Sequence, residues 1–317
     1  MYKSYSLSIV IPAHNESKLI GDTLNSIPKE IDKIFVIDDG STDNQNEIIN
    51  IIKTKDKRIE LIIHESPKGP GGAIISGYKR SLDYDFTVVI GGDNQMDLSE
   101  LSSFLDPLIE HEGDYAKGNR FTPEMIEKTL KDMPKIRIFG NSLISLLTKI
   151  SSGFYNTKDV VDGYTVINKK AINTINWDIA WKGYGYPMDF LMRINAYNLQ
   201  LLEIPRRPIY LPGERQSQIK PFKYFLKVFP MLIKNFFWRI KFKYFLQEFS
   251  PIFLFVNAGF ILISLSLISS FIFIIDKIFL SGSMITSSRT TIIMFMLFIG
   301  MQLLFLGLFL DSKNQKK

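Results

Sequence analysis

The stretch TVVIGGDNQMDLSEL, residues 87–101, joins a strand pattern to a polar segment, and the rest of the chain decides how it is interpreted. Its β-branched start is typical of a buried strand, and the two glycines that follow end that strand. A group of oxygen-bearing side chains comes next: Asp93, Asn94, Gln95 and Asp97. Two interpretations fit this window alone. It is either a polar loop that caps a helix at Leu98, or a set of carboxylates at the C-terminal edge of a strand that holds a divalent cation.

The sequence up to this stretch alternates between strand and helix patterns. Nearly continuous Val/Ile segments predict strands at 7–13, 33–39, 59–64 and 86–92, and helical spacing predicts helices at 16–27, 45–54 and 71–82. Such alternation is typical of an α/β domain with a parallel, doubly wound sheet, in which ligands bind beyond the C-terminal ends of the strands. Polar sequence follows three of these strands (PAHNES, DDGSTD and GGDNQMD), so we expect the three ends to form one site.

The composition excludes several kinds of site. The chain of 317 residues is 46% apolar and contains no cysteine, which excludes disulfides, thiolate metal sites and cysteine nucleophiles. Its three histidines (His14, His64 and His111) lie far apart in the sequence and give no ligand-cluster pattern. The N-terminal apolar run is too short for the core of a signal peptide, so we expect no secretion.

Two long apolar segments lie near the C-terminus. Residues 249–275 and 290–310 contain no charged side chain, and a bilayer-spanning helix needs about 20 such residues. A buried core helix is the alternative interpretation. Two uninterrupted runs at the end of an otherwise mixed sequence favour two membrane spans, at about 251–275 and 290–310.

Basic residues concentrate just before the first span. Residues 220–248 hold seven lysines and arginines and one acid, a charge of +6 that equals the net charge of the whole chain. Positive and negative charges therefore cancel in the rest of the chain. The net positive charge of the protein does not indicate that it binds nucleic acid. Cations beside a span attract anionic lipid head groups and mark the cytoplasmic side. We therefore predict amphipathic helices on the membrane, divided at Pro230, and a cytoplasmic C-terminal tail.

These patterns predict three parts of the chain. They are an α/β domain (1–219), a basic amphipathic segment (220–248) and two spans with a tail (249–317), with a short outer loop at 276–289.

Motifs spread over essentially the whole chain resemble those of one family. They are IVIPAHNE (9–16), VIDDGSTD (36–43), GPGGAIISGY (69–78), GGDNQ (91–95), KGNRF (117–121), DVVDGYTVI (159–167), KGYGYPMDFLMRI (182–194) and YLPGERQSQIK (210–220). In this order and spacing they resemble the family 2 glycosyltransferases with the GT-A fold, and within it the polyprenyl-phosphate sugar transferases of the dolichyl-phosphate mannose synthase type. The resemblance implies an inverting enzyme that moves one sugar from a nucleotide diphosphate sugar (UDP- or GDP-hexose) to a polyprenyl phosphate (dolichyl or undecaprenyl) at the cytoplasmic membrane face.

The resemblance also implies a donor site at the polar strand ends. A divalent cation, Mg²⁺ or Mn²⁺, would neutralise the charge that develops on the leaving diphosphate, and Asp93 with the Gln95 carbonyl suits such a hard cation. Two alternatives stay open. Residues 38–40 could form a helix-capping turn, in which at least one of Asp38 and Asp39 serves only that turn. The glycine loop at 69–73 could reflect turn geometry alone, although the adjacent Lys68 could reach a phosphate. The donor contacts implied are Pro12, His14, Glu16, Asp38, Asp39, Gly72 and Asp93.

The acceptor site implied by the family depends on basic residues. The forked guanidinium of arginine suits a phosphate monoester, although Arg120 and Arg137 could equally be surface salt-bridge partners. Because a phosphate acceptor is already ionised, the reaction needs little help from a general base. The residues implied are, for the acceptor phosphate, Arg120, Arg137, Asn141 and Ser217, and, for catalysis, Asp93, Arg120, Asp159 and Asp189.

The chain departs from the family pattern in three places. Gly91 replaces the first acid of the usual acid-any-acid strand end, Gln218 replaces a lysine after Ser217, and His14 stands where an aromatic or small residue is common. Two other functions therefore stay open. One is a processive polysaccharide synthase, which would carry a Gln-x-x-Arg-Trp motif and more spans, and the other is a degenerate GT-A membrane scaffold. The sequence does not give the sugar, the nucleotide base, the prenyl length or the oligomeric state, so a homo-oligomer stays open.

Overall fold

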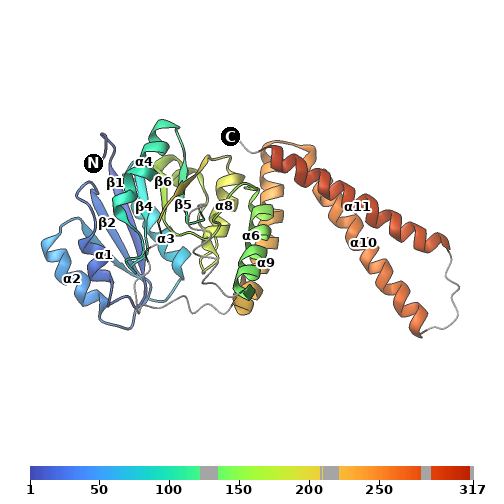
Figure 1. Cartoon of the computed structure of the whole chain (residues 1–317), viewed down its shortest axis with the longest axis horizontal. Helices are drawn as coiled ribbons and strands as arrows, with labels where there is room; N and C mark the ends of the chain where they lie inside the picture. The colour runs from blue at the N-terminus through green and yellow to red at the C-terminus, as the bar shows by residue number, and fades with distance from the viewer. Residues whose placement is uncertain (122–134, 208, 210–220, 280–286, 315–317) are drawn as a thin grey trace. The chain divides into compact units, whose positions relative to one another are not determined.

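The computed structural model describes residues 1–121, 135–207, 209, 221–279 and 287–314, which belong to two compact units, Met1–Phe236 and Phe237–Lys317. The first unit holds a seven-stranded sheet with helices on both faces (Figure 1). Its strands are β1 (Leu7–Ala13), β2 (Lys33–Asp38), β3 (Ile59–Ile63), β4 (Phe86–Val89), β5 (Tyr115–Asn119), β6 (Thr165–Asn168) and β7 (Leu201–Pro205). Its helices are α1 (Ile20–Asn25), α2 (Gln45–Lys55), α3 (Pro70–Arg80), the 3₁₀ turn η1 (Leu98–Glu100), α4 (Leu101–Glu110), α6 (Lys135–Ser152), α7 (Lys169–Thr174), α8 (Tyr186–Ala196) and most of α9 (Pro221–Lys241).

The sheet is mostly parallel, as the strand and helix alternation predicts. Its strand order is β3-β2-β1-β4-β6-β5-β7. β1 pairs in parallel with both β2 and β4, whereas β6 is antiparallel to both of its neighbours, β4 and β5. All four strands expected in the first 92 residues are confirmed, and the strand expected at 86–92 ends earlier, at Val89.

Both faces of the sheet are buried, which explains why its strands read as continuous apolar runs. On β1, Leu7, Ile9 and Ile11 point to one face, where they pack with side chains of α1, α2 and α4. Val10 points to the other face and packs with side chains of α3, α7 and α8. This period of two along each strand buries alternate residues in two separate cores.

Helix α9 does not divide at Pro230, contrary to our expectation of two short helices. It continues through the proline from Pro221 to Lys241. Pro230 itself is exposed, whereas Val228, Met231 and Leu232 are buried against side chains that include Met188 of α8. A proline removes one backbone hydrogen bond of a helix, and the packing of this apolar stripe on the sheet domain holds the two halves in one helix.

The second unit contains two long apolar helices, α10 (Pro251–Phe279) and α11 (Ser287–Lys313), after a π-helical segment, η2 (Phe242–Gln247). Within them, Pro251–Asp276 and Ser288–Lys313 are long and apolar enough to cross a membrane. Their large apolar side chains are mostly exposed, as expected for surfaces that meet lipid rather than a protein core. The two helices approach closely at Gly300, where a Cβ would lie 2.9 Å from Ile263 Cγ1.

Two of the seven basic residues predicted to face lipid are buried instead. Arg239 is fully buried and forms two hydrogen bonds of 2.8 Å with the Asp311 carboxylate, which also accepts a 2.5 Å bond from Tyr244 Oη. Lys243 is 3% exposed. Within this unit, therefore, Arg239 serves an internal ion pair and does not add to the charge of the surface.

Candidate active site at the carboxyl edge of the sheet

The polar loops of the first unit meet at one edge of the sheet. β1, β2 and β4 are mutually parallel, and because β6 is antiparallel to both β4 and β5, β5 and its parallel neighbour β7 share their direction. The carboxyl ends of these five strands therefore lie at the same edge as the start of β6. Ligands of doubly wound sheets bind at this edge.

Asn15 joins the loops that follow β1 and β2. Its backbone has φ 58°, a left-handed conformation that asparagine tolerates better than most residues. Its amide donates to Ser41 Oγ at 2.9 Å, and its side-chain oxygen accepts from the Thr42 amide at 2.8 Å. The two loops thus form one connected surface.

Three predicted donor contacts lie at this joint. Pro12 is half-buried on β1, and His14 is exposed, with Nδ1 2.9 Å from the Asp39 carbonyl oxygen. Glu16 is half-buried, and its Cγ lies 3.6 Å from the position that a Cβ would take on Gly92. The first loop therefore lies beside the strand end that carries Asp93.

Asp38 has internal partners for both carboxylate oxygens. It is 1% exposed at the end of β2. Oδ1 accepts from the Ser41 amide at 3.0 Å and from Gln45 Nε2 at 2.8 Å, and Oδ2 accepts from Asn46 Nδ2 at 2.8 Å. Asp38 thus closes the turn after β2 and binds two side chains of the first turn of α2, but it accepts from no backbone amide of that helix.

Asp39 shapes a different loop. Its carboxylate accepts from the Lys68 and Gly69 amides, both at 2.7 Å, and lies 2.8 Å from His64 Nδ1. Burial raises the pKa of the Asp39 carboxyl, but the hydrogen bonds from His64 and the two amides lower it by more, so its pKa lies below the ordinary value. The ionised carboxylate therefore fixes the loop before α3.

The glycine loop at 69–73 packs tightly on the segment before α8. Gly69 has φ 86°, and a Cβ at Gly71 would lie 2.6 Å from the Trp181 carbonyl oxygen. The Gly72 amide donates to the Lys182 carbonyl at 3.1 Å, so this amide is already engaged within the protein. Turn geometry and close packing explain these glycines without a bound phosphate.

Asp93 has a different environment from the other acids of this edge. Asn94, next to it, has φ 54° and makes a sharp turn. The Asp93 carboxylate folds back over Gly91, where a Cβ would lie only 2.7 Å from Oδ1, and it accepts one long contact of 3.4 Å from the Gln95 amide. Burial raises the pKa of Asp93, and the Gln95 amide and the Arg206 charge offset only part of that rise.

Arg120 lies just beyond β5 and is held by two acids. Its Nε donates to Asp159 Oδ2 at 2.7 Å and Nη2 donates to Oδ1 at 3.1 Å, while Nε also lies 3.0 Å from Asp162 Oδ2. Burial raises the pKa of Asp159, but Arg120 and the nearby Lys117 lower it by more, to about 2. Asp159 is therefore a permanent anion that positions the guanidinium.

Three charged residues of this edge were not among the predicted site residues. Asp162 is 1% exposed and accepts from Arg206 Nε at 2.8 Å. Lys117, 1% exposed on β5, donates to the Asp159 carbonyl. Lys117 and Asp162 could have been predicted from the sequence, because each is a charged residue inside an apolar segment. Arg206 follows β7 and has no such sequence signal.

Asp189 lies in the interior of the first unit. It is fully buried on α8, and its Oδ2 accepts from the Trp181 amide at 2.7 Å and from Arg193 Nε at 2.9 Å. Its Oδ1 accepts from Asn235 Nδ2 at 2.6 Å. These contacts join the segment before α8 to helix α9.

Residues 8–175 match the sequence profile of the family described as glycosyl transferase family 2, which is more than half of the chain. This chain is a family 2 glycosyltransferase. Its relatives include a UDP-N-acetylglucosamine–dolichyl-phosphate N-acetylglucosaminyltransferase of Methanococcus voltae, 29% identical over 64% of this chain and 85% of the relative. An undecaprenyl-phosphate mannosyltransferase of Micrococcus luteus is 25% identical over 62% of this chain and 80% of the relative.

The glycosyltransferase also shares its fold with solved structures. Glucosyl-3-phosphoglycerate synthase from Mycobacterium tuberculosis, in a complex with Mn²⁺, UDP and phosphoglyceric acid, superimposes with a TM-score of 0.53. The sequence identity is 18%, and the match covers 74% of this chain and 78% of the synthase. The predicted GT-A architecture is thereby confirmed.

The oxygen ligands that this glycosyltransferase offers fit one divalent cation. Substrate oxygens would supply the remaining ligands of that cation. Among the described residues, no three histidine, aspartate or glutamate side chains gather as a ready-made metal cluster. Asp93 supplies one half-buried carboxylate with a raised pKa, and Gln95 beside it is half-buried as well. Mg²⁺ is usually bound by one or two carboxylates together with substrate phosphates and water, so this set suits it.

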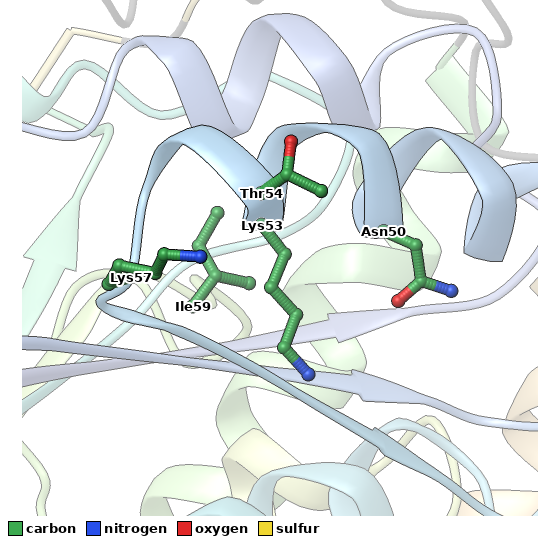
Figure 2. Close-up of a pocket in the computed structure, with 5 residues that line it drawn as sticks. All are labelled: Asn50, Lys53, Thr54, Lys57 and Ile59. Carbon is green, nitrogen blue, oxygen red and sulfur yellow. The ribbon is translucent and has the colours of Figure 1, made fainter.

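Three predicted acceptor residues have no described side chain. Arg137 and Asn141 fall on helix α6, but their side chains lie outside the described residues, as does the whole of Ser217. A pocket elsewhere in the glycosyltransferase contains none of the predicted residues (Figure 2). It lies at the end of α2 and the start of β3, opposite the carboxyl edge, and is lined by Asn50, Lys53, Thr54, Lys57 and Ile59.

Proposed function

We propose that this glycosyltransferase moves one sugar from a nucleotide diphosphate sugar to a polyprenyl phosphate, with inversion at the anomeric carbon. The observation that carries the proposal is Arg120, a guanidinium positioned at the same sheet edge as Asp93, in a chain with two helices able to cross a membrane. The names of the Methanococcus voltae and Micrococcus luteus relatives support it, since both specify a lipid-phosphate acceptor.

The donor would bind across the ends of β1, β2 and β4. Pro12, His14 and Glu16 would face the nucleoside, while Asp38 and Asp39 hold the loops around it and Gly72 packs the glycine loop. Asp93 and Gln95 would hold Mg²⁺ or Mn²⁺. When bound, the cation neutralises the charge that develops on the leaving UDP or GDP.

The acceptor phosphate would bind at Arg120. Asp159 orients the guanidinium and, with a pKa of about 2, stays ionised at neutral pH, so it is not a proton acceptor. A phosphate monoester is itself ionised at this pH, since its second pKa is about 6. Its oxygen attacks the anomeric carbon while the bond to the diphosphate breaks, and no general base is needed. Arg137, Asn141 and Ser217 would add contacts to the same phosphate.

Helix α9 would bring the site to the lipid surface. Lys223, Lys227 and Lys234 are exposed and recur at intervals of four and seven residues, which places them on one helical face. Each would contribute about 1 kcal/mol of attraction to an anionic leaflet. The positive-inside rule then puts the catalytic domain and both termini in the cytoplasm. A reporter fused after Lys317 that was active only outside the cell would contradict this orientation.

Transfer of radiolabelled sugar into organic-extractable lipid tests the proposal. The acceptor, undecaprenyl or dolichyl phosphate, is titrated at saturating donor and Mn²⁺, with UDP- and GDP-hexoses as donors. Arg120→Ala should raise the acceptor KM at least about tenfold, or ~1.4 kcal/mol, with donor affinity nearly unchanged. Arg120→Lys should restore only part of this, since an ammonium cannot reproduce the fork.

The matched control is Arg80→Ala, which removes an exposed arginine at the far end of α3 and should behave as wild type. Equal activity of wild type and Arg120→Ala across the titration would remove Arg120 from the acceptor site. Label in long polymer instead of lipid would indicate a processive synthase. No label and no divalent-dependent nucleotide release with any donor would indicate a scaffold.

A further inference from the structure

The side chain of Arg206 crosses a neighbouring strand at the carboxyl edge of the sheet. Arg206 follows β7, but its side chain turns back across the neighbouring strand β5 to reach Asp162, which precedes β6. It passes over Gly118. A Cβ there would lie 2.9 Å from Arg206 Cδ and 2.8 Å from Asp162 Oδ1, closer than real Cβ contacts come. The missing side chain of Gly118 is what lets this contact form.

Asp162 brings two arginines together. Its Oδ2 lies 2.8 Å from Arg206 Nε and 3.0 Å from Arg120 Nε, and its Oδ1 accepts from the Tyr164 amide at 2.8 Å. The carboxylate is fixed by its own turn and thereby sets the places of both guanidinium groups. Arg120 and Arg206 therefore both contact one carboxylate oxygen, Oδ2 of Asp162, at the end of the sheet.

The two arginines differ in how many of their guanidinium nitrogens donate to carboxylates of the protein. Arg120 binds Asp159 with two nitrogens. Arg206 gives only Nε to a carboxylate. Its Nη1 makes one long contact of 3.4 Å with the Arg207 carbonyl, and within the described part of the chain its Nη2 has no hydrogen-bond partner. Arg206 as a whole is 6% exposed, but none of its nitrogens is among the described buried polar atoms that lack a partner, so Nη2 keeps some accessible surface where a ligand could bind.

We propose that Arg206 is a second phosphate-binding arginine of the site, with Asp162 and Gly118 as the residues that position it. The terminal fork of a guanidinium matches two oxygens of a phosphate group. Arg206 shares the Asp162 carboxylate with Arg120, so both guanidinium groups lie at the same point of this edge. The ligand is a phosphate oxygen, either of the donor diphosphate or of the lipid monophosphate.

The surrounding ionisable groups are consistent with this role. Lys117, Asp159 and Glu203 lie around Arg120: Glu203 accepts from the Asp159 amide at 3.1 Å, and Lys117 donates to the Asp159 carbonyl. Those three groups interact with one another and, through Asp159, with Arg120. Arg206 stands apart from them, on the Asp162 side, with its terminal nitrogens unclaimed by any described carboxylate.

The inference rests on the proposed function, and two measurements on the full-length protein in detergent distinguish the phosphate sources. The first is the equilibrium dissociation constant of pyrophosphate with Mn²⁺, which probes the donor diphosphate. The second is the KM of undecaprenyl phosphate in the transfer assay. Arg206→Met should weaken one of the two at least tenfold. Arg207→Met, which removes the exposed arginine next in sequence, is the matched control and should leave both unchanged.

A double-mutant cycle tests the path over Gly118. If Gly118 matters because Arg206 passes over it, Gly118→Ala alone should weaken the same binding constant as Arg206→Met, and it should add nothing in the Arg206→Met background. Gly21→Ala is the glycine control, because a Cβ there meets Ile48 Cγ2 at an ordinary 3.6 Å. Additive effects of Gly118→Ala and Arg206→Met would overturn the positioning role of Gly118.

Arg206→Lys decides the case if Arg206→Met does not fold, because it keeps a cation beside Asp162 but lacks the fork. Wild-type constants on both arms for Arg206→Lys, or for a folded Arg206→Met, would overturn the inference. A wild-type protein that binds pyrophosphate but transfers no sugar would contradict the proposed function instead. The pyrophosphate arm would then still decide the role of Arg206.

Discussion

Asp39 and Asp93 lie in the loops that follow two strands of the same sheet, yet their surroundings are opposite. Asp39 accepts two backbone amides at 2.7 Å and pairs with His64, and its pKa lies below the ordinary value. Asp93 accepts one amide at 3.4 Å, and burial raises its pKa. Both are aspartates after apolar strands, so only their partners distinguish them.

This difference in hydrogen-bond partners distinguishes acids that stabilise loops from acids whose carboxylate oxygens are available to a ligand. A carboxylate whose oxygens are filled by amides has little left to offer a cation, and its ionised form is already stabilised. A buried carboxylate with almost no donors gains most when a cation arrives. By this criterion Asp38, Asp39 and Asp189 hold the structure together, and Asp93 is the acid of this edge that is suited to a metal ion.

The largest expected effect is that of Asp93→Asn. It should lower Mn²⁺-dependent sugar transfer at least about a thousandfold, or ~4 kcal/mol, because the amide cannot replace an anionic ligand. Since burial raises the pKa of Asp93 in the folded state, its charge destabilises the fold at neutral pH, and the variant should be at least as stable as wild type. Transfer rates and urea unfolding measure the two quantities. Wild-type turnover in the variant would show that Asp93 is not a ligand.

Asp189→Asn should affect stability next most strongly. It breaks a buried ion pair with Arg193 and weakens the contact to Asn235, so we expect the free energy of unfolding to fall by about 3 kcal/mol. Denaturant unfolding gives the value, and the Mn²⁺ dependence of donor binding per folded molecule should not change. Full stability with lost transfer would place Asp189 at the substrate instead.

Asp39→Asn should cost about 2 kcal/mol of unfolding free energy, because one of the two part-buried loop amides loses its acceptor. The folded-state pKa of Asp39 lies below the unfolded value, so its stabilising effect is present at neutral pH and is lost as the pH falls through the folded pKa. The stability difference between wild type and variant should therefore shrink in acid. A difference that stays constant with pH would contradict this account.

Gly91→Ala should have the smallest effect, about a tenfold loss of Mn²⁺ affinity. A Cβ at this position would lie 2.7 Å from Asp93 Oδ1 and would push the carboxylate from its place. Gly21→Ala, where a Cβ has room, is the control. Unchanged Mn²⁺ affinity would mean that the carboxylate moves freely in the protein before it binds.

The strands and their polar ends could be predicted from local sequence. The Val/Ile runs set β1 to β4, and parallel strands put their ends on one edge. The partners of each acid could not be predicted, because the amides of Lys68 and Gly69 reach Asp39 only after β3 and α3 are in place. In the same way, Arg206 reaches Asp162 only through the parallel pairing of β7 with β5.

Pro230 shows where local propensity fails. The helix-breaking tendency of proline predicts a division here, and that prediction is wrong because packing of Met231 and its neighbours against α8 keeps α9 continuous. Glycine loops are the converse case. The sequence leaves open whether the loop at 69–73 lies near a phosphate, and the structure shows Gly71 and Gly72 packed closely on the segment at Trp181 and Lys182.

Direct titration of Mn²⁺ tests the distinction between the two acids most directly. Free Mn²⁺ is counted by its electron paramagnetic resonance signal in full-length wild type, Asp39→Asn and Asp93→Asn, each with a nucleoside diphosphate present and at a concentration where the protein is folded. We expect one bound Mn²⁺ per chain in wild type and Asp39→Asn and none in Asp93→Asn. Retained Mn²⁺ binding in Asp93→Asn, or its loss in a folded Asp39→Asn, would contradict this expectation.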